Sequence, residues 1–216
     1  MRAFAIAALA LCASCAEHER VSPSSYPSSG LYTPGSTLGA SDPTDTPPKR
    51  ICASLPPAPG AVDGGAVGTS GTLTIEYMTK TYDGLYAPRN VTAVWIETMN
   101  EQYVATLEVQ AAVRRKDLVY FQDHACVDQL GPDAIASATL RTHDKMHVLE
   151  WTGLDFEGKG VPDGDYQLFI EMTETDLEPG QLTVFGIAKG PESYILPMQI
   201  PLEAPLVQVT ATWAVQ

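Results

Sequence analysis

Basic residues are scarce in this sequence, which has 13 Lys and Arg against 26 Asp and Glu and a formal net charge of −13. A nucleic-acid-binding protein needs clustered Lys and Arg to neutralise phosphates. The basic run Arg114-Arg115-Lys116 is short and fits a solvated turn between strands. The composition therefore argues against a nucleic-acid partner and mainly favours solubility.

Signatures of common enzymes and of membrane spans are missing as well. The sequence has no G-x-S-x-G string, and Gly68-Thr69-Ser70-Gly71 is too short for a phosphate loop and lacks its lysine. No apolar segment reaches the roughly 20 residues of a lasting transmembrane helix, and no internal repeat or coiled coil is evident. These absences favour a non-enzymatic protein.

What is present begins with an export signal. Arg2 and the apolar segment Ala3 to Ala13 are typical of a short signal peptide. The small residues before Cys15 resemble the bacterial lipobox, although Cys12 stands where Leu is usual. We expect residues 1–14 to be a lipoprotein signal peptide and Cys15 to be the lipid anchor. The alternative is an ordinary secretory signal, with Cys15 free or removed.

The residue after the proposed anchor indicates a location. Ala16 follows Cys15, and lipoproteins without Asp there usually reach the outer membrane of double-membraned bacteria. We therefore expect a lipid-anchored protein of the bacterial cell envelope, at the outer membrane and facing the periplasm or the surface.

Residues 15–68 are predicted to be a disordered tether, because Val21 to Pro48 is mostly Ser, Pro, Thr and Gly. With Cys12 and Cys15 assigned to the signal and the anchor, Cys52 and Cys126 remain. Exported proteins meet oxidising conditions, so these two are expected to form a disulfide between the tether and the folded domain. The alternative is two unpaired thiols.

Residues 69–216 are expected to form one all-β domain. Strands are predicted from alternating apolar and polar residues and from β-branched and aromatic content, at 72–79, 90–98, 103–109, 145–151, 166–171, 181–188, 194–200 and 206–215. Residues 118–121 fit either a strand or a short helical turn. Short strands without a long helical period predict an antiparallel, Ig-like or fibronectin-III-like β-sandwich.

The segment Trp151 to Glu171 is interpreted as the central hairpin of that domain. Its Gly and Asp residues are typical of tight turns. Asp155, Glu157 and Gly160 partly match a calcium loop, but the match fails where the loop needs its bidentate Glu. Solvated turn acids are the favoured interpretation.

Several strings resemble a known family: VWIET, YVATL, SATL, HVLEWTG and YQLFIE, between Leu73 and Leu202. They are similar to predicted periplasmic bacterial proteins grouped as domain-of-unknown-function family 2271. The W-x-G-x-D…P-x-G-x-Y module also resembles the Ig-like domain of flagellar hook-capping proteins. Asn100-Glu101 stands where the family usually has a Gly turn. The resemblance implies export and a β-sandwich, and no established activity.

The string Asp133 to Thr139 offers a second functional hypothesis. It resembles the acceptor motif of bacterial flavin transferases, which attach FMN from FAD to a hydroxyl as a phosphodiester. By position, Thr139 is the acceptor, and Asp133, Ser137 and Ala138 are recognition residues. The alternative is the start of a strand, with Ala138 and Thr139 at the core edge and in the ladder.

A third hypothesis is copper or zinc handling by His124, Cys126, His143 and His147. Along a strand, His143 and His147 lie roughly 13 Å apart, too far to share one ion. The first expectation is therefore a non-enzymatic module that binds a protein or an envelope component at exposed sheet edges. Covalent FMN on Thr139 is the alternative, and no other cofactor and no metal site are expected.

Overall fold

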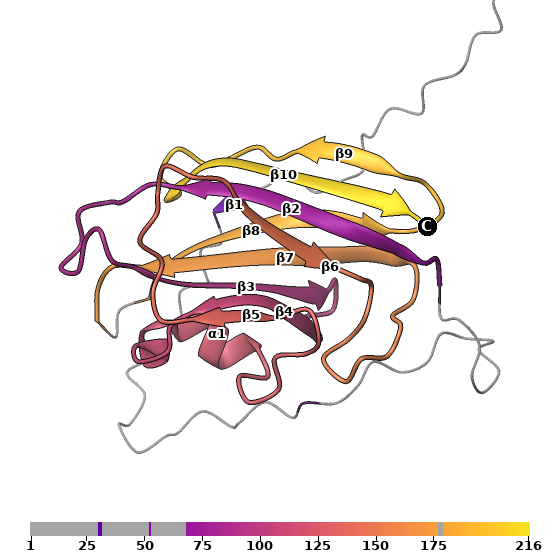
Figure 1. Cartoon of the computed structure of the whole chain (residues 1–216), viewed down its shortest axis with the longest axis horizontal. Coiled ribbons are helices and arrows are strands. Elements are labelled where there is room, and N and C mark those ends of the chain that lie inside the picture. Colours follow the sequence, from indigo (N-terminus) through magenta and orange to yellow (C-terminus); the bar gives the residue numbers. More distant parts are fainter. Residues whose placement is uncertain (1–29, 32–51, 53–67, 177–178) are drawn as a thin grey trace, which may run out of the picture.

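The computed structural model describes residues 30–31, 52, 68–176 and 179–216 (Figure 1). The predicted signal peptide, the proposed anchor Cys15 and most of the predicted tether lie outside these residues. The described elements are β1 (Gly30–Leu31), β2 (Gly71–Thr79), β3 (Val91–Thr98), β4 (Tyr103–Gln110), the 3-10 helix η1 (Arg115–Asp117), α1 (Val119–His124), β5 (Ile135–Ser137), β6 (His147–Trp151), β7 (Gly164–Thr173), β8 (Gln181–Lys189), β9 (Tyr194–Pro197) and β10 (Leu206–Val215). None of the described helices is long and apolar enough to cross a membrane.

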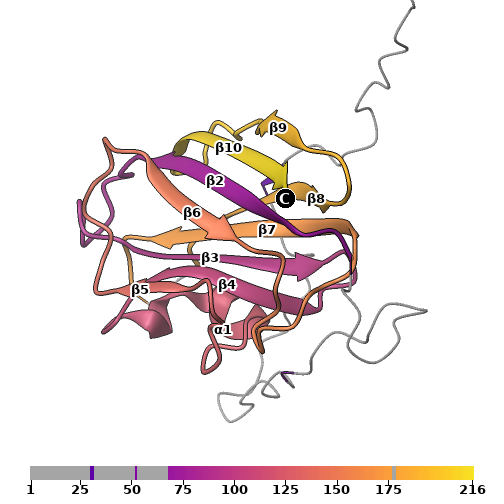
Figure 2. The same ribbon diagram turned by 45° about the vertical axis from the view of Figure 1, so that its right-hand side comes forward.

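The strands form two packed sheets (Figure 1; Figure 2). The six-stranded sheet has the order β1-β8-β7-β3-β4-β5, and the four-stranded sheet has the order β6-β2-β10-β9. Neighbouring strands are antiparallel except β4 and β5, which run parallel. The predicted all-β sandwich is confirmed.

The four-stranded sheet buries one face. In β2, Leu73, Ile75 and Tyr77 are fully buried, and the residues between them are exposed or half-buried. In β10, Ala211 and Trp213 are buried with the same alternation. This is the pattern of a strand with one face on the core and the other in solvent.

The six-stranded sheet buries both faces. All residues of β3 and β4 except the last of each strand are buried. Val94 and Ile96 face the core between the sheets, whereas Trp95 belongs to a second core on the outer face. There the Trp95 ring stacks on Phe169 at 5.0 Å and meets Phe121 of α1 edge-on at 5.5 Å. Helix α1 therefore forms a third layer over this sheet.

The ambiguous segment at residues 118–121 is part of that layer and is mostly helical, since α1 begins at Val119. The carboxylate of Glu171 on β7 accepts hydrogen bonds from the backbone N–H groups of Tyr120 (3.2 Å) and Phe121 (2.8 Å). It thereby satisfies amides that have no partner within the first helical turn. Burial raises the pKa of Glu171 to about 7, and the backbone hydrogen bonds only partly oppose this rise.

Two described parts of the predicted tether contact the domain. A disulfide joins Cys52 to Cys126, the pair expected from the sequence, with 5.7 Å between the two Cα atoms. Cys126 is buried in the outer core next to α1. Gly30–Leu31 pairs with Val184 and Thr183 at the free edge of β8.

The predicted hairpin at Trp151 to Glu171 is wrong. Strand β6 pairs with β2 in one sheet, whereas β7 pairs with β3 and β8 in the other. The Gly- and Asp-rich segment is therefore a connection between sheets. Asp155 does shape a turn, since its carboxylate accepts the N–H groups of Glu157 (2.9 Å) and Lys159 (2.8 Å). It is buried, however, and not solvated as expected.

Candidate functional site at two sheet edges

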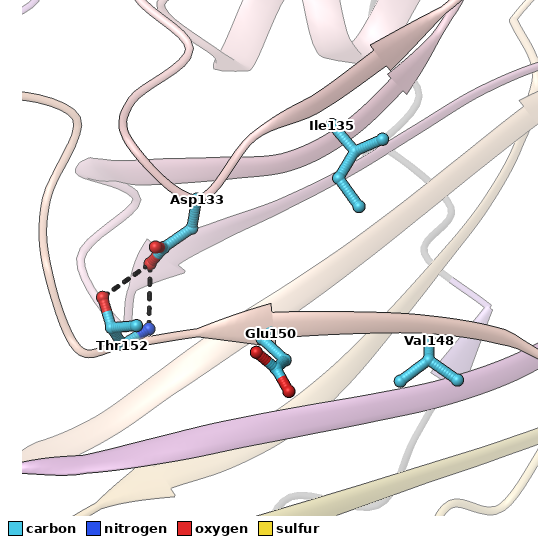
Figure 3. Close-up of a pocket in the computed structure, with 5 residues that line it drawn as sticks. All are labelled: Asp133, Ile135, Val148, Glu150 and Thr152. Carbon is cyan, nitrogen blue, oxygen red and sulfur yellow. Dashed lines mark hydrogen bonds between the residues drawn. The ribbon is translucent and has the colours of Figure 1, made fainter.

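A groove of about 370 Å³ lies between β5 at the edge of one sheet and β6 at the edge of the other (Figure 3). Its lining comes from two segments that are distant in the chain: Asp133, Ile135, Val148, Glu150 and Thr152. Within the described residues, β6 pairs only with β2, and β5 pairs only with β4. Two free strand edges therefore border the groove.

Each strand presents a half-exposed apolar side chain to this groove. Ile135 is 49% exposed and Val148 is 51% exposed, large values for branched apolar residues in strands. The alternation of β6 explains Val148, because the neighbouring Leu149 and Trp151 are buried in the core. The same alternation leaves Glu150 exposed beside Val148.

Asp133 and Thr152 close one end of the groove (Figure 3). The Asp133 carboxylate accepts the backbone N–H of Thr152 at 2.8 Å and its hydroxyl at 2.9 Å. The carboxylate thus stands where the carbonyl of a neighbouring strand would accept the same amide. Beyond the other end of β6, the His147 ring contacts the Thr142 carbonyl, with 2.9 Å between Nε2 and the oxygen.

Polar groups link the groove to the interior. The Ser137 hydroxyl donates to the Gln110 side-chain oxygen, and Gln110 Nε2 donates to Glu108. The other carboxylate oxygen of buried Glu108 accepts the Tyr77 hydroxyl from the opposite sheet. Burial raises the pKa of Tyr77 well above its ordinary value, and the Glu108 charge and hydrogen bond raise it further. Tyr77 is therefore a neutral donor at ordinary pH, and these contacts hold the two sheets in register beneath the groove.

The flavin-acceptor string runs along this same edge. Asp133 is held by Thr152, Ser137 ends β5, and Ala138 is exposed. Thr139 is half-buried, and its hydroxyl accepts a hydrogen bond from Arg141 Nε at 3.3 Å. The string thus lies on an accessible strand edge, and β5 pairs with β4 in parallel instead of forming a free loop.

The proposed metal ligands do not come together. Cys126 is bonded to Cys52, and His124 Nδ1 lies 3.1 Å from the buried carboxylate of Glu97. His143 contacts Thr79 and the Pro88 carbonyl at 2.9 and 2.7 Å. In the part of the chain that the structure describes, no three His, Cys, Asp or Glu side chains are placed to hold a metal ion. Copper or zinc handling thus has no ligand cluster among those residues.

Reasoning from the sequence missed the β6 half of the groove. Val148 and Glu150 lie in the strand predicted at 145–151, and Thr152 lies in the hairpin predicted after it. Neither prediction indicates that they face residues 133–135. The alternation along β6 places Val148 and Glu150 on its outward face. Such alternation identifies an outward face, but it does not show which distant segment lies beside it.

In comparisons with known proteins, no family model, curated protein or solved structure matches this chain. The resemblance to the periplasmic family therefore stays a prediction.

Proposed function

We propose that this chain is an exported, lipid-anchored, non-enzymatic module of the bacterial cell envelope, which binds a protein partner along β6. The observation that carries the proposal is the edge of β6, which no described strand covers, beside the exposed side chains of Ile135 and Val148. A free edge offers backbone donors and acceptors to an extended segment of another chain, and half-exposed apolar residues add area to bury.

The edges of β9 and β8 are better protected against such pairing than the edge of β6. Strand β9, at the opposite edge of the same sheet, ends in Pro197, which has no N–H to offer a neighbour. The free edge of β8 is partly covered by Gly30–Leu31. Strand β6 contains neither Pro nor Lys, the residues that commonly blunt an edge. This difference favours β6 over β8 and β9 as the proposed contact.

Export is supported by the disulfide. The Cys52–Cys126 bond is of a kind that persists in oxidising compartments and is rare in the cytosol. If Cys15 is acylated, the disulfide fixes the tether to the domain at Cys52, a position between the lipid anchor and β2 in the chain. Palmitate labelling of the native protein tests the anchor. Label on the wild type and none on Cys15→Ser supports it. Label on both proteins, or on neither, contradicts it.

Photo-crosslinking in intact native cells tests the binding proposal. We expect p-benzoylphenylalanine in place of Val148 to give one discrete adduct, whereas the same group in place of Ile195 on β9 gives none. Ile195 is the matched control, since it is an exposed branched residue on the other edge strand of the sheet. Equal crosslinking at both positions, or none at Val148, would contradict a protein partner; an adduct with lipid or polysaccharide would indicate an envelope component instead.

A second candidate is a redox carrier with FMN on Thr139, favoured by the accessible edge and by Arg141 beside the hydroxyl. In the transfer, the Thr139 oxygen attacks the FMN phosphorus of FAD, the pyrophosphate bond breaks, AMP leaves, and the hydroxyl proton passes to solvent. The Arg141 guanidinium is placed to pair with the resulting phosphodiester.

Coexpression with a flavin transferase tests this second function. Yellow protein, with the mass of FMN on the peptide that contains Thr139, is expected for the wild type and for the control Thr142→Ala, but not for Thr139→Ala. Colourless wild-type protein under these conditions would eliminate the flavin hypothesis.

A further inference from the structure

We infer that the segment bound by β6 is short and extended and alternates basic with apolar side chains. This inference rests on the proposed binding function and names the chemistry of its partner. It follows from the direction of the free amides, the length of the open edge and the charges beside it.

The backbone amides of β6 that no described strand pairs with face the groove. Thr152 directs its N–H across the groove to Asp133. Amide directions alternate along a strand, so the N–H groups of Glu150 and Val148 face the same side. These two residues lie opposite Thr74 and Glu76 of β2, and in this alternation their hydrogen-bonding groups point away from β2. A partner strand would find donors and acceptors at both positions.

The open edge is bounded at both ends. At one end, the Thr152 N–H already donates a hydrogen bond to the Asp133 carboxylate, so it is not available to a partner. At the other end, the Thr142 backbone lies against the ring of His147. The window that remains is Val148–Glu150, roughly 10 Å long at about 3.3 Å per residue. A bound segment would therefore pair over only a few residues.

The two faces of such a segment would meet different surroundings. On the outer face, its side chains would lie beside both Val148 and Glu150, with Glu76 of β2 opposite Val148. On the inner face, the alternate side chains would point toward Ile135 on β5 (Figure 3). Basic residues complement the first face, because their charged ends can pair with the carboxylates while their aliphatic stems cover Val148. Apolar residues complement the second face. A polyanion, by contrast, would be repelled by Glu150 and by the net charge of −13.

The test uses the full-length protein in detergent and a fluorescent, end-capped heptapeptide of alternating Lys and Val, followed by anisotropy at physiological salt. We expect saturable binding that weakens at least tenfold in Glu150→Lys and in Val148→Lys. The matched controls Glu192→Lys and Ile195→Lys, beside and on β9, should bind as the wild type does. A peptide that is N-methylated at every residue should not bind, because none of its amides can donate to β6.

Other results would overturn the inference. Equal weakening in Glu150→Lys and Glu192→Lys would mean nonspecific attraction to an acidic protein, and undiminished binding of the N-methylated peptide would exclude strand pairing. If the peptide fails to bind while Val148 still gives its adduct in cells, the partner has another chemistry and only this inference falls. If the peptide does not bind and Val148 gives no adduct in cells, both this inference and the proposed binding function are wrong.

Discussion

The two sheets of this sandwich differ in what covers them. The six-stranded sheet is buried on both faces, with Trp95 under α1 and Cys126 bonded to Cys52. The four-stranded sheet is buried on one face, and its edge strand β6 borders an open groove. The difference suggests a division of roles, in which one sheet carries the added stabilising layer and the other leaves surface free for a partner.

Among the tests of this comparison, Trp95→Ala is expected to have the largest effect on the free energy of unfolding. The ring is fully buried between Phe121 and Phe169, and its N–H donates to Glu97 at 2.8 Å. Its removal should lower the free energy of unfolding by about 3–5 kcal/mol, measured by urea denaturation followed by circular dichroism. Thr74→Ala, on the outer face of the other sheet, should change it by less than about 0.5 kcal/mol. Similar values for the two variants would mean that the outer layer is not a packed core.

Removal of the Cys52–Cys126 disulfide is expected to have the next largest effect on the free energy of unfolding. It closes a separation of 74 residues, for which the chain-entropy relation gives about 4 kcal/mol as an upper figure. We expect the double variant Cys52→Ser with Cys126→Ser to lose up to that amount. Hydrogen exchange should accelerate in α1 and remain slow in β10. Equal acceleration in both elements would show that the disulfide supports the whole sandwich and not one layer.

Glu171 gives a pH dependence specific to the outer layer. Its pKa rises from an ordinary value of 4.5 to about 7 because of burial. The folded state therefore holds the proton more tightly than the unfolded state. This stabilising contribution is complete below about pH 4.5 and disappears as the pH rises through 7.

The corresponding variant is Glu171→Gln, which cannot ionise. Between these two pH values the wild type should lose on the order of 3 kcal/mol relative to the variant, measured as the difference between their unfolding free energies at each pH. Parallel pH profiles would show that Glu171 titrates normally in the folded protein.

The smallest expected effect concerns the two edges of the four-stranded sheet. Val148→Lys and Ile195→Lys both replace exposed side chains, so each should change the unfolding free energy by less than about 0.5 kcal/mol. Thermal unfolding of the two variants checks this. If Val148→Lys alone is destabilised, then β6 is closed by contacts within the fold and is not a free edge.

The strand positions were largely predictable because they follow from local pattern. In β2 and β10, alternating burial matches alternating chemistry, with Leu73 and Trp213 buried and Thr74 and Thr212 half-buried on the other face. The outer core of the six-stranded sheet was less visible, because β3 is buried on both faces and its residues do not alternate. In the site, the string Asp133 to Thr139 was recognised, but its role as a flavin acceptor stays a prediction.

By itself, the sequence indicated where most strands form, but not β1 or β5. It also gave the expected pairing of Cys52 with Cys126 and the low content of basic residues that argues against nucleic acid. Only the tertiary structure decided that β6 and β7 belong to different sheets, and that residues 133–135 face residues 148–152. The physical reason is that turn chemistry acts over a few neighbouring residues. The choice of sheet depends instead on which distant apolar faces bury each other, here Leu149 and Trp151 beside Ile75 and Leu73.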